Sequence, residues 1–230
     1  MSRPLVLVAH GSRDPAAGAC VSQLASVVRN RLPETDVRIG FVDVRRPSVA
    51  DALHGVAEAV VVPAFLAVGF HVRADLPAQL AHAGAPDCCV TPTLGPDPEL
   101  VRAAAARLTQ AGWRPGDAVV LAAAGSSDQR AVADVRTAAR LLRVHVGRPV
   151  RVGFVATGAP RVDALVAGLR TAGERRVAVA SWLLAPGVFQ RRVDGCGADM
   201  VAEPLGVHPA VVDAVVARYA AAVAAAEVAA

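Results

Sequence analysis

Two histidines and an aspartate lie where strands in the first half of the chain are expected to end. His10 directly follows the first apolar run, Asp43 ends the second, and His71 lies in a loop after the third. Ligands of parallel α/β sheets bind outside the carboxyl ends of the strands, so the three side chains are expected at one rim. Neutral imidazole is the commonest protein ligand of divalent transition metals, and a carboxylate can serve as a further ligand or as a base. The pattern predicts a site that handles a metal ion.

The chain also repeats itself. Four blocks recur in the same order at an offset of about 110–117 residues. The blocks pair VLVAHGSRDPAA (6–17) with VLAAAGSSDQRA (120–131), VRIGFVD (37–43) with VRVGFVA (150–156), VVVPAFLAVG (60–69) with VAVASWLLAPG (177–187), and TLGPDPELV (93–101) with PLGVHPAVV (204–212). Collinear blocks at a nearly constant offset indicate two copies of one domain, which we place at residues 1–113 and 117–230.

The second copy lacks the three polar residues of the first. Opposite His10, Asp43 and His71 the repeat places Ala124, Ala156 and Val188 or Phe189, respectively. A single histidine at a strand end is more often a structural, hydrogen-bonded residue than a ligand. Two histidines that occupy equivalent positions and disappear together favour a site instead. For Asp43, helix capping or a salt bridge explains the residue as well as a role in the site does.

Short strands are expected to alternate with helices in both copies. The expected strands are 5–9, 37–43, 59–63, 88–91, 118–123, 150–156, 177–181 and 200–202. The expected helices include one that has Pro15 in its first turn and stops at Pro33, and others over 48–57, 75–82, 97–111 and 209–230. This alternation predicts an α/β fold in which each domain has a small parallel sheet of about four strands flanked by helices.

Composition excludes several classes of function. All 24 basic residues are arginine, so a Walker A phosphate loop, a pyridoxal Schiff base and a lysine nucleophile are excluded. The formal charge of +4 is scattered and only 3% of residues are aromatic, which argues against nucleic-acid binding. No apolar stretch approaches the roughly 18 residues that span a bilayer, and we expect a cytoplasmic protein. The four cysteines have no CxxC spacing, so neither disulfides nor an iron–sulfur site are expected.

Four segments together resemble a known family: VLVAHGSRDP, FVDVRRPSV, VVPAFLAVGFHVRADLP and LGPDPEL. They look like the sirohydrochlorin chelatases of the small cobalamin and siroheme type, in a double-length form with two tandem chelatase-like domains. The resemblance implies ATP-independent insertion of cobalt or iron into sirohydrochlorin, with the metal as a substrate and no permanently bound cofactor. The family's metal-handling histidines map onto His10 and His71, and its acidic residue, usually glutamate, maps onto Asp43. The shorter side chain of Asp43 is a departure from the family pattern.

The resemblance also implies how the macrocycle would be held. Because the periphery of sirohydrochlorin is polyanionic, arginines near the rim are candidate clamps: Arg13, Arg45, Arg46 and Arg73. Ser12 and Arg13 are expected to begin a helix whose backbone N–H groups could receive an anion. Phe70 and Phe189 are expected to contact the apolar ring. We expect the site to open onto a cleft between the domains, so that the chain acts as a monomer with an internal pseudo-dimer.

Two other functions fit parts of this pattern. A non-catalytic carrier of a tetrapyrrole or a metal would use the same histidines without insertion. A phosphohistidine nucleophile is a weaker alternative, because histidine phosphatases have Arg-His-Gly where Ala9 precedes His10 here. The residues distinguish neither cobalt from iron or nickel nor a cobalamin from a siroheme pathway.

Overall fold

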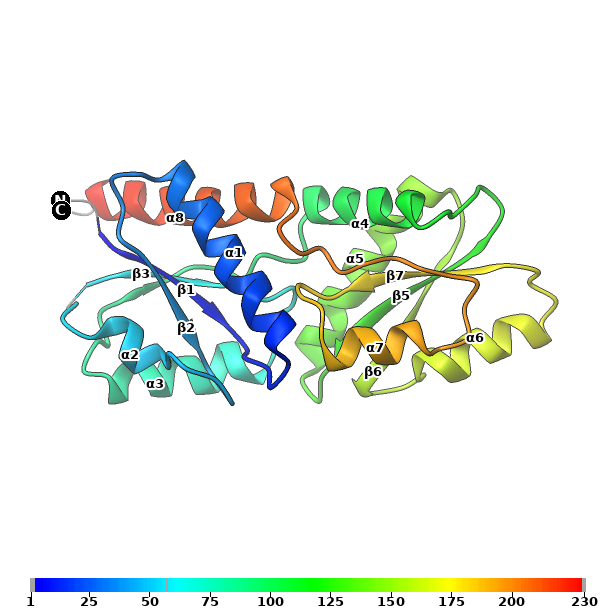
Figure 1. The fold of residues 1–230 in the computed structure, drawn as a ribbon, viewed down its shortest axis with the longest axis horizontal. Helices are drawn as coiled ribbons and strands as arrows, with labels where there is room; N and C mark the ends of the chain where they lie inside the picture. Colours follow the sequence, from blue (N-terminus) through cyan, green and yellow to red (C-terminus); the bar gives the residue numbers. More distant parts are fainter. Residues whose placement is uncertain (1–2, 57, 229–230) are drawn as a thin grey trace. The chain divides into compact units, whose positions relative to one another are not determined.

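The computed structural model describes residues 3–56 and 58–228, which form two compact units, each drawn in Figure 1. Unit 1 contains residues 1–94 and 207–230, and unit 2 contains residues 95–206. Each unit has one four-stranded sheet in which all the pairings are parallel. The predicted fold class, α/β with two small parallel sheets flanked by helices, is therefore confirmed.

The sheet of unit 1 has the strand order β2-β1-β3-β4. Its strands are β1 (Leu5–Ala9), β2 (Val37–Phe41), β3 (Val60–Pro63) and β4 (Cys89–Val90). Every residue of β1 is buried, because helices cover both faces of the sheet. Val6 and Val8 pack into one apolar cluster with α2 and α3, and the alternation of a strand turns Leu5 and Leu7 toward the opposite face. An apolar, doubly covered strand is what the continuous hydrophobic run predicted.

The helices of unit 1 lie in two layers, with α1 and α8 on one face of the sheet and α2 and α3 on the other (Figure 1). They are α1 (Pro15–Arg31), α2 (Val49–Leu53), the π-helix η1 (His71–Asp75), α3 (Leu76–His82) and α8 (Pro209–Val228). The predicted ends of two helices, at Ala57 and Ala230, lie outside the described residues. Among the described helices, none is long and apolar enough to cross a membrane.

Two predictions about the helices of unit 1 are corrected. His71 lies in the π-helix η1 and not in a loop, because the N–H of Leu76 donates to the carbonyl of His71 and closes one wide turn. The first helix begins at Pro15 and not at Ser12 or Arg13. Its N-cap is Asp14, whose carboxylate accepts from the N–H of Ala16. The chain's own aspartate therefore takes one of the N–H groups that could have received an anion.

Unit 2 repeats this architecture with the strand order β6-β5-β7-β8. Its strands are β5 (Ala118–Gly125), β6 (Val150–Thr157), β7 (Val177–Trp182) and β8 (Met200–Val201), and its helices are α4 (Pro98–Gln110), α5 (Gln129–Val146), α6 (Val162–Thr171) and α7 (Val188–Asp194). The four strands and α4 follow the predicted ranges closely, and helices lie between the strands as predicted, since the same apolar periodicity recurs in both copies.

The compact units divide the chain differently from the sequence copies at 1–113 and 117–230. Helix α4 ends the first copy, yet it packs on α5 and β7 of unit 2. Helix α8 ends the second copy, yet it packs on α1 and β3 of unit 1. Each unit is thus completed by the closing helix of the other copy.

Candidate metal centre

His10 and His71 come together in unit 1, although 60 residues separate them in the chain. Their Nε2 atoms lie 3.0 Å apart, and the two rings meet edge to face with centroids 4.3 Å apart. His10 follows β1 directly, and His71 begins η1. His10 is exposed and His71 is partly exposed, so an ion or a ligand can reach both rings.

The other ring nitrogen of each histidine is already engaged. Nδ1 of His10 lies 3.0 Å from the carbonyl of Gly11, and Nδ1 of His71 lies 2.5 Å from a carboxylate oxygen of Asp75. Carbonyl and carboxylate oxygens only accept, so each Nδ1 is assigned a hydrogen and donates. Each neutral ring then directs the lone pair of its Nε2 atom toward the other ring.

Two lone pairs that face each other at this distance repel, and a cation between them removes the repulsion. With bonds of about 2.0–2.1 Å, as in zinc sites, two nitrogens on one ion lie about 2.8–3.4 Å apart at angles between a right angle and a tetrahedral one. The separation of 3.0 Å falls within this range. The pair therefore has the spacing and the chemistry of two ligands of one divalent ion.

The loop that carries His10 is fixed against the loop that carries Asp43. The N–H of Asp43 donates to the carbonyl of His10 at 3.0 Å. Gly11 has a φ of +95°, and a Cβ atom there would lie 1.9 Å from the carbonyl oxygen of Asp43. Only glycine fits this close approach and this backbone conformation.

The structure does not join the carboxylate of Asp43 to the histidine pair. Asp43 is exposed, and its Oδ1 accepts from the N–H of Val44 at 2.8 Å. Across residues 3–56 and 58–228, no three histidine, cysteine or acidic side chains are grouped so that they could hold a metal ion together. The candidate site thus consists of two imidazole nitrogens, with an acidic residue after the neighbouring strand.

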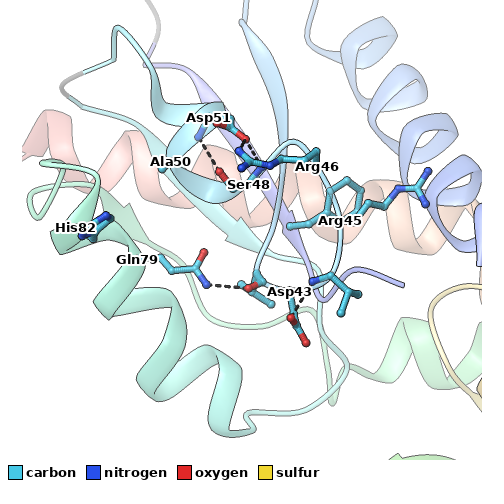
Figure 2. Close-up of a pocket in the computed structure, with 11 residues that line it drawn as sticks. Asp43, Arg45, Arg46, Ser48, Ala50, Asp51, Gln79 and His82 are labelled. Atoms are coloured by element: carbon cyan, nitrogen blue, oxygen red, sulfur yellow. Dashed lines mark hydrogen bonds and ion pairs between the residues drawn. The ribbon is translucent and has the colours of Figure 1, made fainter. Parts of the chain in front are cut away.

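Asp43 instead lines an open hollow of about 660 Å³ beside α2 and α3. Figure 2 shows the side chains around it, including the amide of Gln79, which donates to the carbonyl of Val42 at 2.8 Å. Arg46 does not present a free guanidinium here, because its Nη1 atom lies 2.6 Å from Asp51. This ion pair occupies an arginine that was a candidate clamp for substrate carboxylates.

The guanidinium of Arg45 is positioned by contacts with Phe41, Ser12 and Gly18. It lies over the ring of Phe41, 5.8 Å from the centroid, and its Nη1 donates to the carbonyl of Ser12 at 3.4 Å. A Cβ atom on Gly18 of α1 would lie 2.3 Å from Cζ of Arg45. In the repeat, Gly18 falls opposite Val132 and Arg45 opposite Gly158. The second copy therefore has the larger residue on the helix and glycine in the loop, the reverse of the first copy.

The remaining predicted contacts of the substrate are spread over both units. Phe70 is 59% exposed, and its ring centroid lies 6.2 Å from that of His71. Arg73 is exposed on η1, and Arg13 is exposed before α1. Ser12 is a turn residue whose hydroxyl accepts from the N–H of Asp14. Phe189 is 39% exposed in the first turn of α7, in unit 2.

Asp75 is the residue of this site that sequence reasoning missed. It was interpreted only as the start of a helix, since aspartate is common at helix N-termini. The available signal was its spacing of four residues from His71, which places both on one face of a helical segment.

Comparisons with known proteins agree with this architecture. The model of the CbiX family matches residues 4–111 and again residues 118–222. Sirohydrochlorin cobaltochelatase of Methanopyrus kandleri is 38% identical over 81 residues, which are 33% of this chain and 57% of the relative. The same enzyme of Methanococcoides burtonii is 33% identical over 78 residues, 32% of this chain and 60% of the relative. The matches thus cover less than two thirds of these relatives.

Two solved structures share the fold over nearly the whole chain. SirB from Bacillus subtilis with Fe³⁺ superposes with a TM-score of 0.82 at 23% identity, covering 99% of this chain and 98% of SirB. CbiX, described as the terminal enzyme for biosynthesis of siroheme in denitrifying bacteria, superposes with a TM-score of 0.73 at 23% identity, covering 96% of this chain and 99% of CbiX.

Proposed function

Because the chain belongs to the CbiX family, we propose that it inserts a divalent metal, cobalt or iron, into sirohydrochlorin without ATP. One observation of this chain carries the proposal: the Nε2 atoms of His10 and His71 face each other at 3.0 Å while both Nδ1 atoms are engaged elsewhere. Two such nitrogens, open to solvent at one strand rim, suit a metal that must be bound and then released.

The reaction consumes one metal ion and one metal-free macrocycle, and it releases two pyrrole protons. His10 and His71 would take the ion from water through their Nε2 atoms and hold it for the ring. As the ion passes to the four ring nitrogens, both Nε2 atoms become free, and imidazole can carry a proton at neutral pH. Two imidazoles can thus accept the two protons and pass them to solvent.

The macrocycle would be held through its carboxylates and its flat face. Arg45 is the best-placed clamp, because Phe41 and Gly18 fix its guanidinium beside the loop that follows His10. Arg13 and Arg73 are exposed and can reach further carboxylates, and Phe70 offers its ring next to His71. Asp43 remains a proposed base or ligand. A contact of Phe189 or Ser12 with the macrocycle stays a prediction, as do the internal pseudo-dimer and the cytoplasmic location.

Imidazole ligands bind cobalt and iron alike, so the histidine pair does not choose between them. The curated relatives are cobaltochelatases, whereas SirB has been seen with Fe³⁺ and with cobalt. We therefore propose the reaction for both metals and leave their ranking to a direct comparison of rates.

The test is spectrophotometric metal insertion by the purified chain under anaerobic conditions, with Co²⁺ and Fe²⁺ compared at equal concentrations. We expect His10→Ala and His71→Ala each to lower the rate by more than about tenfold, which corresponds to about 1.4 kcal/mol of lost transition-state stabilisation. His54→Ala, which changes an exposed histidine of the same unit, is the matched control and should keep the wild-type rate.

Two results would contradict the proposal. Histidine variants that insert metal at the wild-type rate would exclude this site. A wild-type chain that binds Co²⁺ through the histidines, yet metallates sirohydrochlorin no faster than buffer does, would identify a carrier.

A further inference from the structure

We propose that Asp75 is a positioning residue that fixes the orientation and tautomer of His71. The inference rests on the proposed function, because it concerns how one of the two metal ligands is presented. It assigns a role to a residue that the sequence indicated only as the start of a helix.

The contact itself is short and local. Oδ2 of Asp75 lies 2.5 Å from Nδ1 of His71, four residues earlier on η1. Both side chains are about one third exposed, so the pair lies at the edge of the protein and the imidazole can still reach a ligand. With Nδ1 donating to the carboxylate, the lone pair of Nε2 points toward His10.

Asp75 differs from the other aspartates that begin helices in this chain. Asp14, Asp97 and Asp128 are N-caps, and each accepts from the backbone N–H two residues later: Ala16, Glu99 and Arg130. Asp75 occupies the N-cap of α3 but makes no such bond.

The local sequence explains this exception. The residue two positions after Asp75 is Pro77, which has no N–H to donate. Asp75 also has helical dihedrals as the last residue of η1, whereas Asp14, Asp97 and Asp128 are extended. Its carboxylate therefore makes no cap bond and contacts His71 instead.

The second copy supports the same assignment. Aligning Gly69 with Gly187 places Phe189 opposite His71 and Val193 opposite Asp75. Phe189 is partly exposed, whereas Val193 is fully buried in the core of unit 2. The histidine and its carboxylate are therefore kept together in one copy and replaced together by apolar residues in the other.

A carboxylate behind a ligating imidazole has a defined effect. It holds the ring plane, selects the tautomer and makes the ligating nitrogen a better donor to the metal, and its loss typically costs about 10–100-fold in metal affinity. Asp75 would thus set how tightly His71 holds the metal before the ion passes to the ring. It would not contact the ion or the macrocycle.

The experiment is an anaerobic titration of the full chain with Co²⁺ alone, followed by the cobalt absorption bands in the visible range. We expect Asp75→Ala to weaken cobalt binding by about 10–100-fold. The cobalt affinity of Asp75→Asn should lie between those of wild type and Asp75→Ala, because the amide oxygen of asparagine still accepts a hydrogen bond from Nδ1 of His71. Asp128→Ala, which removes a helix cap in unit 2, is the control for general destabilisation and should bind cobalt as wild type does.

The outcomes separate this inference from the proposed function. If His71→Ala abolishes cobalt binding while Asp75→Ala leaves it unchanged, the positioning role is wrong and the metal site stands. If His71→Ala itself leaves cobalt binding unchanged, the metal site and the positioning role both fail. Should Asp75→Ala not fold, as judged by circular dichroism, Asp75→Leu replaces it, because leucine has a similar volume and cannot accept a hydrogen bond.

Discussion

At the scale of single residues, Gly18 and Arg45 form a pair that can be tested from both sides. A methyl group on Gly18 would lie 2.3 Å from Cζ of Arg45, so Gly18→Ala must displace the guanidinium. The displaced group is the end of a flexible side chain, and the fold should persist. If Arg45 binds a carboxylate of the macrocycle, Gly18→Ala and Arg45→Ala should both raise KM for sirohydrochlorin with little change in kcat, as expected for lost uniform binding.

The control for this prediction is another helical glycine. Gly168 of α6 has open space where its Cβ would lie, so Gly168→Ala should leave KM unchanged. It should also stabilise the protein by about 0.5–1 kcal/mol, because alanine restricts the unfolded chain. An unchanged KM in Gly18→Ala would remove Arg45 from the substrate site.

Val44 is a second residue with a measurable consequence. Its φ of +48° is unusual for a β-branched side chain, and the left-handed conformation costs about 1–2 kcal/mol for residues other than glycine. The side chain is 49% exposed, so little apolar burial opposes a change to glycine. We expect Val44→Gly to raise the free energy of unfolding by up to about 1 kcal/mol in urea denaturation. A lower free energy of unfolding would mean that the backbone there is not strained.

The two histidines of the candidate site could be predicted from the sequence, whereas Asp75 and the position of Arg45 could not. Histidines are rare in this chain, and the loss of His10 and His71 from the second copy marked them as a pair. Asp75 is also replaced in the second copy, by Val193, but an aspartate before a helix is ordinarily interpreted as a cap, and its bond to His71 is visible only in the structure. The contact between Arg45 and Gly18 could not be predicted from the sequence either, because a contact between a loop and a helix leaves no repeating pattern of residues.

At the scale of elements, the start of α2 makes stability depend on pH. Asp51 accepts from the backbone N–H of Ser48 and pairs with Arg46, and these two contacts lower the pKa of its carboxyl to about 2. Because the folded pKa lies below the ordinary value of 3.8, the contribution is complete above about pH 4 and is lost as the pH falls toward 2.

Asp51→Asn tests this dependence. The variant should be less stable than wild type at pH 5, and the difference between their urea midpoints should shrink at pH 3. All other acidic groups are the same in the two proteins. If the difference between their urea midpoints is equal at pH 5 and pH 3, the carboxylate of Asp51 does not stabilise the fold through its charge.

The elements also show where periodicity suffices and where it does not. Leu5–Ala9 was predicted to the residue, because a continuous apolar run between turn signals defines a covered strand. The π-helix η1 was not predicted, since a single wide turn of five residues leaves no repeating pattern. The site depends on that turn, which carries both His71 and Asp75.

At the scale of the whole chain, the repeat identified two copies but not which helix completes which sheet. Helices α4 and α8 end equivalent copies, and an apolar helix face does not specify the sheet that it covers. The contacts of α8 show that this helix completes unit 1. Its Tyr219 hydroxyl donates to the carbonyl of Arg3 at 2.7 Å, and its Asp213 pairs with Arg31 of α1 at 3.1 Å.

The dependence of unit 1 on α8 gives the last prediction. Removing residues 207–230 takes away four buried side chains, Val211, Val212, Val215 and Tyr219, and uncovers α1 and β3. Unit 2 keeps all of its elements. Hydrogen exchange read by mass spectrometry should therefore show lost protection in α1 and β3, with α5 and β6 still protected. A chain that ends at Ala222 keeps the four buried side chains and should exchange like the full chain. Full protection of α1 in the chain that ends at Gly206 would mean that unit 1 folds without α8.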